Sequence, residues 1–334
     1  MPSEMTAHVI EEYGDPGVFT ETEQPVPDPA PGEIRVEVVA SSVNPVDYKI
    51  RAGHIDPFAP DFPATLGCDI SGVVDVVGEG VERFEAGDEV YGMPGGAGRQ
   101  GALADYVVGH AGTFADAPES IPLADAAALP VVALTAWEML TDKSDVGLGD
   151  DVLVYGASGG VGHIGVQIAR WLGANVVATG STAEKRDLAL DLGADAAIDY
   201  TETDPGAYVA EHTDGAGFDT VFDPIGDDHL ATAFEAVRPF GSVVTTESSA
   251  AEDLSLAPMH QQSLELGVVL VILPVLLGEG QERVGDELED IATLVDDGAV
   301  APHIDRRFSF SDVDEAHELA ESGEFVGKIL LVNE

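Results

Sequence analysis

Short runs of β-branched and other apolar residues, separated by turn-forming residues, fill the first third of the chain. Pro- and Gly-rich segments such as 27–33 and 84–90 lie between these runs. The runs themselves are 34–43, 70–78, 88–93 and 104–109. Such alternation predicts an irregular β domain over residues 1–123, and no helix of convincing period is expected before Ala124.

From Leu123 onward, helical and extended patterns alternate along the chain. Helices are expected at 124–140, 163–173, 183–193 and 228–239, and strands at 151–157, 175–180, 196–200, 218–226, 241–248 and 267–273. Strands that alternate with helices at this spacing pair in parallel through right-handed crossovers. The pattern therefore predicts a doubly wound α/β domain over residues 124–273.

The C-terminal segment, residues 274–334, is too short to form a core of its own. It carries amphipathic helical patterns at 282–298 and 308–323, followed by a strand pattern at 328–334. Because two helices and one strand must bury their apolar faces against another layer, we expect this segment to fold back and complete the β domain.

The most informative motif lies at 152–170, where a strand, a glycine-rich turn and a helix follow one another directly. Glycines let the backbone approach a pyrophosphate, and the helix offers free N–H groups and the positive end of its dipole. Ala157 stands where G-x-G-x-x-G has its first glycine, but the βαβ context indicates a dinucleotide site. The residues expected to hold the diphosphate are Ala157, Ser158, Gly159, Gly160, Val161 and Gly162.

The same turn also fits a hydrolase motif. Residues 156–160 match G-x-S-x-G, in which Ser158 would be a nucleophile. Asp223 with His229 or His260 could then supply the acid and the base. We favour the nucleotide interpretation because the turn lies inside a βαβ unit, and Ser158 is then a small residue near the phosphates.

The residues after the second strand of this domain bear on the choice of cofactor. An acidic residue there would bind the ribose hydroxyls of NAD, but Gly180 occupies that position. Ser181, Lys185 and Arg186 follow, and the two cations favour a 2′-phosphate, hence NADPH. The alternative is that Lys185 and Arg186 pair with nearby carboxylates on an exposed helix.

The charge balance excludes one class of function. The 334 residues include 14 Lys and Arg against 62 Asp and Glu, so the formal net charge is −48. An ordinary nucleic-acid binder must neutralise phosphates and is therefore excluded. Acidic residues are spread along the whole chain and only four Lys occur. Since this much like charge needs screening by salt, we expect a halophile; a generic acidic protein is the alternative.

Cysteine content and hydropathy indicate the compartment. Cys68 is the only cysteine, so no internal disulfide can form. No basic segment followed by an apolar core stands at the N-terminus. The longest apolar run, 267–278, contains Pro274 and is shorter than the ~20 residues that span a bilayer. We therefore expect a cytoplasmic protein with no membrane segment.

Five segments carry a resemblance to a known family. They are 41–53, 66–92, 128–140, 149–170 and 327–332, and the fourth is the most specific. Together they resemble the medium-chain dehydrogenase/reductase superfamily, and within it the zinc-free quinone oxidoreductase or zeta-crystallin-like branch. The resemblance covers nearly the whole chain. It implies a GroES-like catalytic domain formed by both termini, a Rossmann domain that binds NADP, and a cofactor held in the cleft between them.

Zinc-dependent relatives hold a catalytic metal through a Cys, a His and a second Cys. The matching positions here are Asn44, Cys68 and Val131, so one soft ligand remains and we expect no metal. A chain with one cysteine cannot supply the four cysteines of structural zinc. Cys68 is then a small buried residue or a reactive thiol. An alcohol dehydrogenase with unusual ligation by Cys68 and Asp69 is the alternative.

Without a metal, hydride transfer to a quinone or an enone is easier than alcohol chemistry, because one hydrogen-bond donor can stabilise the charge that moves onto oxygen. Tyr48 or Lys49 is expected to be the oxyanion or proton partner, with Asn44 and Asp47 ordering the pocket. Each has a structural alternative: Asn44 and Asp47 as turn caps, Lys49 in an ion pair, Tyr48 in packing.

Three further residues are candidates for contact with the cofactor. Tyr200, after the third strand, resembles an adenine-side contact of this branch. Thr135 would line the nicotinamide site. Lys328 could reach the cofactor or hold the two domains together.

The sequence thus predicts a cytoplasmic NADPH-dependent, zinc-free reductase of quinones or α,β-unsaturated carbonyls. A protein that binds NADPH without catalysis is an alternative of a different class. Residues 267–277 could pair across a homodimer, since apolar strand edges are otherwise a liability, or be buried within the monomer.

Overall fold

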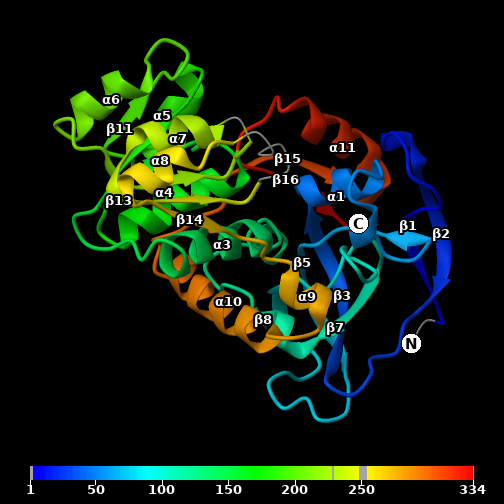
Figure 1. The fold of residues 1–334 in the computed structure, drawn as a ribbon. Coiled ribbons are helices and arrows are strands. Elements are labelled where there is room, and N and C mark those ends of the chain that lie inside the picture. The colour runs from blue at the N-terminus through cyan, green and yellow to red at the C-terminus, as the bar shows by residue number, and fades with distance from the viewer. Residues whose placement is uncertain (1–2, 228, 248–253, 334) are drawn as a thin grey trace. The chain divides into compact units, whose positions relative to one another are not determined.

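The computed structural model divides into two compact units and describes residues 3–227, 229–247 and 254–333 (Figure 1). Unit 1 is Met1–Leu134 with Ile272–Glu334, and unit 2 is Thr135–Val271. The predicted boundary at 123/124 falls earlier than this division, because helix α2 (Leu123–Ala126) packs against strands of unit 1.

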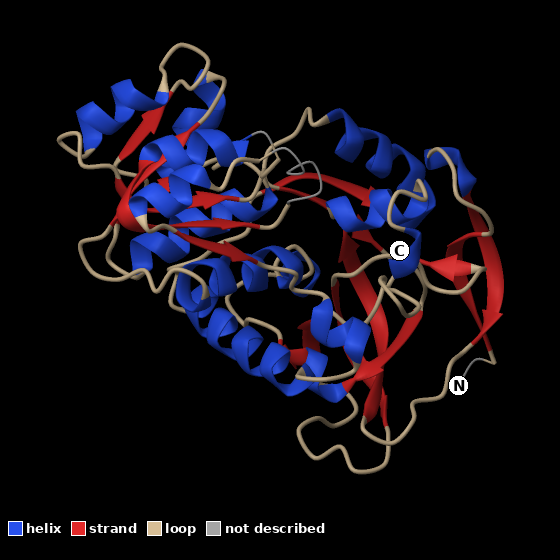
Figure 2. Cartoon of the chain, in the orientation of Figure 1, coloured by secondary structure: helices blue, strands red, loops and turns tan. Residues whose placement is uncertain are grey.

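Unit 1 is built around two β-sheets, whose strands are drawn in red (Figure 2). Its larger sheet has seven strands in the order β15-β16-β3-β5-β6-β8, with β7 paired to β3, and its smaller sheet has the order β2-β1-β4. The strands are β1 (Glu4–Ile10), β2 (Phe19–Pro25), β3 (Glu33–Ser42), β4 (Ala64–Thr65), β5 (Ile70–Val77), β6 (Glu89–Gly92), β7 (Tyr106–His110), β8 (Phe114–Asp116), β15 (Ile304–Ser309) and β16 (Lys328–Val332).

Helices connect or cover the strands of unit 1. They are α1 (Pro45–Arg51), α2, α9 (Leu273–Leu277), α10 (Gln281–Asp296) and α11 (Val313–Ser322), with 3-10 turns at Pro16–Val18, Asp56–Phe58, Ala111–Thr113 and Phe310–Asp312. The expectation of no helix before Ala124 is wrong, because α1 begins at Pro45. Proline suits the first helical position, where its missing N–H costs nothing.

The returning C-terminal segment takes part in the larger sheet of unit 1. Strand β16 lies between β15, with which it is parallel, and β3, with which it is antiparallel. The helix predicted at 308–323 begins later, at Val313, since residues 304–309 form the unexpected strand β15. Alternation in this short strand was masked by its charged residues Asp305, Arg306 and Arg307.

Unit 2 contains a parallel six-stranded sheet in the order β11-β10-β9-β12-β13-β14. The strands are β9 (Asp151–Val154), β10 (Asn175–Thr179), β11 (Ala196–Ile198), β12 (Phe218–Asp223), β13 (Val237–Thr245) and β14 (Glu265–Val268). The helices are α3 (Pro130–Trp137, which begins in unit 1), a π-helical turn η4 (Glu138–Asp142), α4 (Gly160–Trp171), α5 (Ala183–Asp191), α6 (Pro205–His212), α7 (His229–Ala236) and α8 (Ala257–Gln262). This is the predicted doubly wound α/β fold.

Several predicted elements differ from the observed ones. The helix expected at 124–140 is divided at Pro130 into α2 and α3. The strand expected at 267–273 overlaps β14 only at its start, since β14 ends at Val268 and the short helix α9 begins at Leu273. The start of the helix predicted at 228–239 and the ends of the strands predicted at 241–248 and 328–334 fall outside the described residues. The predicted dimer contact at 267–277 stays a prediction.

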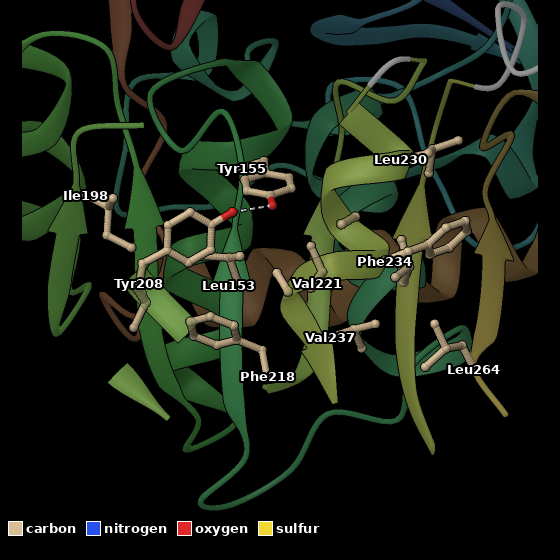
Figure 3. Packing of buried hydrophobic residues seen from close by; sticks show 14 residues of the cluster. Leu153, Tyr155, Ile198, Tyr208, Phe218, Val221, Leu230, Phe234, Val237 and Leu264 are labelled. Carbon is tan, nitrogen blue, oxygen red and sulfur yellow. Dashed lines mark hydrogen bonds between the residues drawn. The ribbon is translucent and has the colours of Figure 1, made fainter. Parts of the chain in front are cut away.

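The core of unit 2 lies between the sheet and its helices. Figure 3 shows side chains of β9, β12 and α7 packed together, with Leu153, Val221 and Phe234 among the buried members. Within it the hydroxyl oxygens of Tyr155 and Tyr208 are 2.8 Å apart and share a hydrogen bond. This satisfies both buried hydroxyl groups, as a close-packed interior requires. No helix among the described residues is both long and apolar enough to cross a bilayer.

Candidate functional site

The glycine-rich turn of unit 2 joins β9 to α4. Gly156 has a φ of +57°, a conformation that suits glycine, and the N–H of Gly159 donates to its carbonyl at 2.9 Å. A Cβ added at Gly162 would lie 2.1 Å from the same carbonyl oxygen. Hydrogen alone therefore fits at 162, and the first turn of α4 packs directly on the glycine turn. This places the free N–H groups of the helix start beside the turn, an arrangement that can bind an anion.

A cavity of about 300 Å³ lies at the carboxyl edge of the same sheet. Its wall includes Tyr155 after β9, Thr179 at the end of β10, Tyr200 after β11 and Ile225 after β12. The strand order reverses between β9 and β12, and ligands of open α/β sheets bind at such a switch point. Tyr200 is 48% exposed, so its ring is accessible to a ligand in this cavity.

The residues predicted to choose the cofactor surround the end of β10. The side chain of Thr182 accepts a hydrogen bond from the N–H of Lys185 at 3.3 Å and caps α5. The guanidinium of Arg186 donates to the carbonyl of Gly180 at 3.1 Å and to the carboxylate of Asp199 at 2.6 Å. Arg186 therefore pairs with a nearby carboxylate, as the alternative to phosphate binding predicts.

In unit 1, Asp69 is the centre of a buried polar cluster. Its carboxylate accepts hydrogen bonds from the Ser42 hydroxyl, from the Asn44 amide at 2.7 Å and from the N–H of Val131 at 2.7 Å. The ammonium of Lys328 lies 3.3 Å from the same carboxylate. A buried carboxylate is tolerated only when paired and hydrogen-bonded in this way.

Lys328 is itself enclosed by this cluster. Its ammonium donates to the Val43 carbonyl at 3.1 Å and to the Asn44 amide oxygen at 2.6 Å, besides its contact with Asp69. The side chain is 2% exposed. These three contacts use the three N–H groups of the ammonium, so the geometry does not favour the predicted contact between Lys328 and the cofactor.

Asp47 fixes the start of α1 through hydrogen bonds to two backbone N–H groups. Its carboxylate accepts from the N–H of Asn44 at 2.8 Å and from the N–H of Gly67 at 3.2 Å. Both Asn44 and Asp47 are buried, which makes them positioning residues for α1. Tyr48 and Lys49 lie on the same helix, are half-buried, and each makes interactions within the protein. Thr135, on α3, is 4% exposed.

Burial raises the pKa of Asp47 from the usual 3.8 to about 6. The folded chain therefore binds this proton more tightly than the unfolded chain. The associated stability is complete below pH 3.8 and is lost as the pH rises through about 6. Burial, together with the nearby carboxylates of Asp47 and Asp69, also raises the pKa of the Cys68 thiol, which stays protonated at neutral pH.

This shift predicts a pH-dependent cost of the Asp47→Asn substitution. The variant does not titrate at this position, so the stability advantage of the wild type should shrink by about 1.4 kcal/mol between pH 5 and pH 8. Denaturant unfolding in molar KCl at both pH values measures the difference. Asp290→Asn, at an exposed position of α10, is the matched control and should show a constant difference. An advantage that grows with pH would contradict the assignment.

Two of the three positions that match zinc ligands have other hydrogen-bond partners. Asn44 is occupied by Asp69 and Lys328, and Val131 offers only its N–H, which is bound to Asp69. An ammonium beside the carboxylate also opposes a divalent cation there. In the described part of the chain, no group of three or more His, Cys, Asp or Glu side chains could hold a metal ion.

Sequence reasoning missed two residues of these sites. Asp69 entered only as an alternative metal ligand, although an acid inside the apolar run 66–74 signals a buried partner, and Lys328 is the corresponding cation in the apolar run 327–332. Asp199, the partner of Arg186, gave no signal in the sequence. The contact joins the residue after strand β11 to helix α5, which follows strand β10.

Two family models match the chain, one for each part of this architecture. The alcohol dehydrogenase GroES-like domain matches residues 30–119, and the zinc-binding dehydrogenase model matches residues 160–273. A 2-methylene-furan-3-one reductase of Solanum lycopersicum is 32% identical over 340 residues, covering 99% of this chain and 80% of the relative. The chain belongs to the medium-chain dehydrogenase/reductase superfamily. It is thereby an oxidoreductase with a GroES-like domain and a Rossmann domain.

Other members of the superfamily match over the whole length. Quinone oxidoreductase 1 of Escherichia coli (strain K12) is 30% identical over 326 residues, covering 96% of this chain and 97% of the relative. The crystal structure of an alcohol dehydrogenase superfamily protein from Novosphingobium aromaticivorans is 37% identical, with a TM-score of 0.93, and covers 99% of this chain and 100% of that one. These relationships do not favour the hydrolase interpretation of Ser158.

Proposed function

We propose that this superfamily member is an NADPH-dependent, zinc-free reductase of quinones or of the C=C bond of α,β-unsaturated carbonyls. The observation that carries the proposal is a contrast between two sites. The turn that would hold a dinucleotide includes the close backbone approach at Gly162, whereas hydrogen bonds to Asp69 and Lys328 engage Asn44 and Val131, two of the three positions that match zinc ligands. Relatives named as a quinone oxidoreductase and a furanone reductase support the acceptor class.

The residues present fit the cofactor. The N–H groups of residues 159–162 would bind the diphosphate, Ser181 and Lys185 the 2′-phosphate, Tyr200 the adenine, and Thr135 the nicotinamide side. When bound, NADPH supplies the hydride. Tyr48 or Lys49 would donate a hydrogen bond to the substrate oxygen that gains negative charge. Asn44 and Asp47 would hold α1, and thus this donor, in place.

The direct test is an assay of NADPH oxidation with one quinone and one enone. It should be run in molar salt, because a net charge of −48 needs screening. We expect turnover with at least one acceptor, and no turnover with either would overturn the proposal. Metal analysis of the purified protein is a second test, since stoichiometric zinc would contradict the zinc-free assignment.

The donor on α1 can be identified by substitution. If one of Tyr48 and Lys49 stabilises the oxyanion, Tyr48→Phe or Lys49→Met should lower kcat about 100-fold to 1,000-fold. The affinity for NADPH, measured by fluorescence titration, should be unchanged. Lys143→Met, at an exposed lysine, is the matched control for loss of a cation. Full activity in both α1 variants would place the donor elsewhere.

A further inference from the structure

Arg186 and Asp199 form an ion pair at the place where the adenosine end of a dinucleotide would lie. Arg186 is on helix α5, and Asp199 directly follows strand β11; the helix and the strand lie side by side at one edge of unit 2 (Figure 1). Each partner is next to a residue of the cavity wall or of the cofactor segment: Asp199 precedes Tyr200, and Arg186 bonds the carbonyl of Gly180, which follows Thr179. The pair is therefore adjacent in sequence or by hydrogen bond to residues next to the cavity wall.

Arg186 also fills the space that an acidic residue at position 180 would need. A Cβ built on Gly180 would lie 3.0 Å from Cγ and 3.1 Å from the backbone nitrogen of Arg186. The arginine thus crowds position 180, where Rossmann domains that bind NAD carry an acidic residue. A guanidinium has five donors and binds phosphate in a bidentate manner, so this position suits a 2′-phosphate.

Asp199 opposes that use of the arginine. One carboxylate oxygen accepts from the Arg186 guanidinium at 2.6 Å, and the other accepts from the N–H and the hydroxyl of Thr201 at 3.0 Å and 2.6 Å. These hydrogen bonds, first that of the Thr201 hydroxyl, hold the pKa of Asp199 below its usual value. The carboxylate is therefore charged at neutral pH and would repel an incoming phosphate.

From this geometry we infer that Asp199 is a negative determinant of cofactor specificity: it competes with the 2′-phosphate of the dinucleotide for Arg186. The inference rests on the proposed function, in which the nucleotide is NADPH. Lys185 then binds the phosphate, and Arg186 contributes only as far as the phosphate displaces Asp199. The chain accordingly discriminates less between phosphorylated and unphosphorylated nucleotides than its two cations suggest.

The test is Asp199→Asn in the full chain. The amide oxygen of the asparagine can still accept from Thr201. Only the oxygen that accepts from Arg186 is replaced, by an NH₂ group that cannot accept. Calorimetry in molar KCl measures the affinity for adenosine 2′,5′-bisphosphate and the affinity for adenosine 5′-monophosphate. The ratio of interest is the first affinity divided by the second. We expect the ratio to rise about fivefold to tenfold, with unchanged affinity for the monophosphate. An unchanged or lower ratio would overturn the inference.

Two further variants separate this mechanism from general charge effects. In an Arg186→Ala background the same Asp199→Asn substitution should change the ratio by less than about twofold, because the guanidinium for which Asp199 and the phosphate compete is gone. Asp195→Asn loosens the Arg170–Asp195 pair, whose atoms are 3.1 Å apart before the start of β11, and should leave the ratio unchanged. An equal gain in either control would contradict the inference. Failure of wild-type protein to bind either nucleotide would instead contradict the proposed function.

Discussion

Gly162→Ala is expected to reduce the affinity for NADPH at least 100-fold and to destabilise unit 2. The added Cβ would meet the Gly156 carbonyl oxygen at 2.1 Å, its carbon at 2.7 Å and Cα of Ala157 at 2.9 Å. All three are backbone atoms of the turn, so no side chain can move aside to make room. The start of α4 must shift away from the turn, which breaks the alignment of its N–H groups toward the diphosphate. Titration of NADPH fluorescence measures the loss.

Gly159→Ala provides the matched control in the same turn. Its Cβ would meet one atom, the Gly156 oxygen, at 3.3 Å, and its φ of −85° is open to any residue. We expect a change of less than about tenfold in affinity. If both variants bind NADPH as the wild type does, the turn does not hold the diphosphate, and the proposed nucleotide site is wrong.

Lys328→Met is expected to be the most destabilising substitution in unit 1. It leaves the Asp69 carboxylate buried without its cation, and breaking a buried pair in this way costs about 3–5 kcal/mol. Both side chains are nearly inaccessible, with 2% and 0% exposed, so water cannot replace the ammonium. Denaturant unfolding of the full chain should show the loss.

A second substitution tests whether the missing charge balance is the cause. Adding Asp69→Asn to Lys328→Met should recover part of the lost stability, since a neutral amide costs less to bury than a carboxylate. Arg170→Met, which removes an ion pair whose partners are 55% and 46% exposed, should cost less than about 1 kcal/mol. A similar loss of stability for Lys328→Met and Arg170→Met would show that burial does not make the loss of an ion pair more destabilising.

The alternation of helices and strands in unit 2 could be predicted because each strand and helix there buries a continuous apolar face. The glycine turn was also predictable, since its spacing reflects a backbone contact that only hydrogen allows. By contrast, α1 depends on Asn44, Pro45 and Asp47, a capping arrangement that alternation does not reveal. A capping box before a short helix is the signal that could have found it.

The candidate site was harder to predict than the fold. Asn44, Asp69 and Lys328 lie far apart in the sequence, and the sequence suggested for Lys328 either a contact with the cofactor or a role in holding the two domains together. Its actual partners follow from the pairing of β16 with β3, which aligns Leu330 with Ser42. A strand pairing between distant segments is fixed by tertiary structure, and no local pattern in either segment specifies it.

The Asp69–Lys328 pair also bears on the order of folding during synthesis. The two residues are 259 positions apart, whereas unit 2 is one uninterrupted segment between them. At a translation rate of 5–20 residues per second, Lys328 is synthesised about 13–50 s after Asp69, with which it forms the ion pair. Unit 2 can therefore fold during synthesis while unit 1 still lacks two strands, β15 and β16, and the ammonium that pairs with its buried carboxylate.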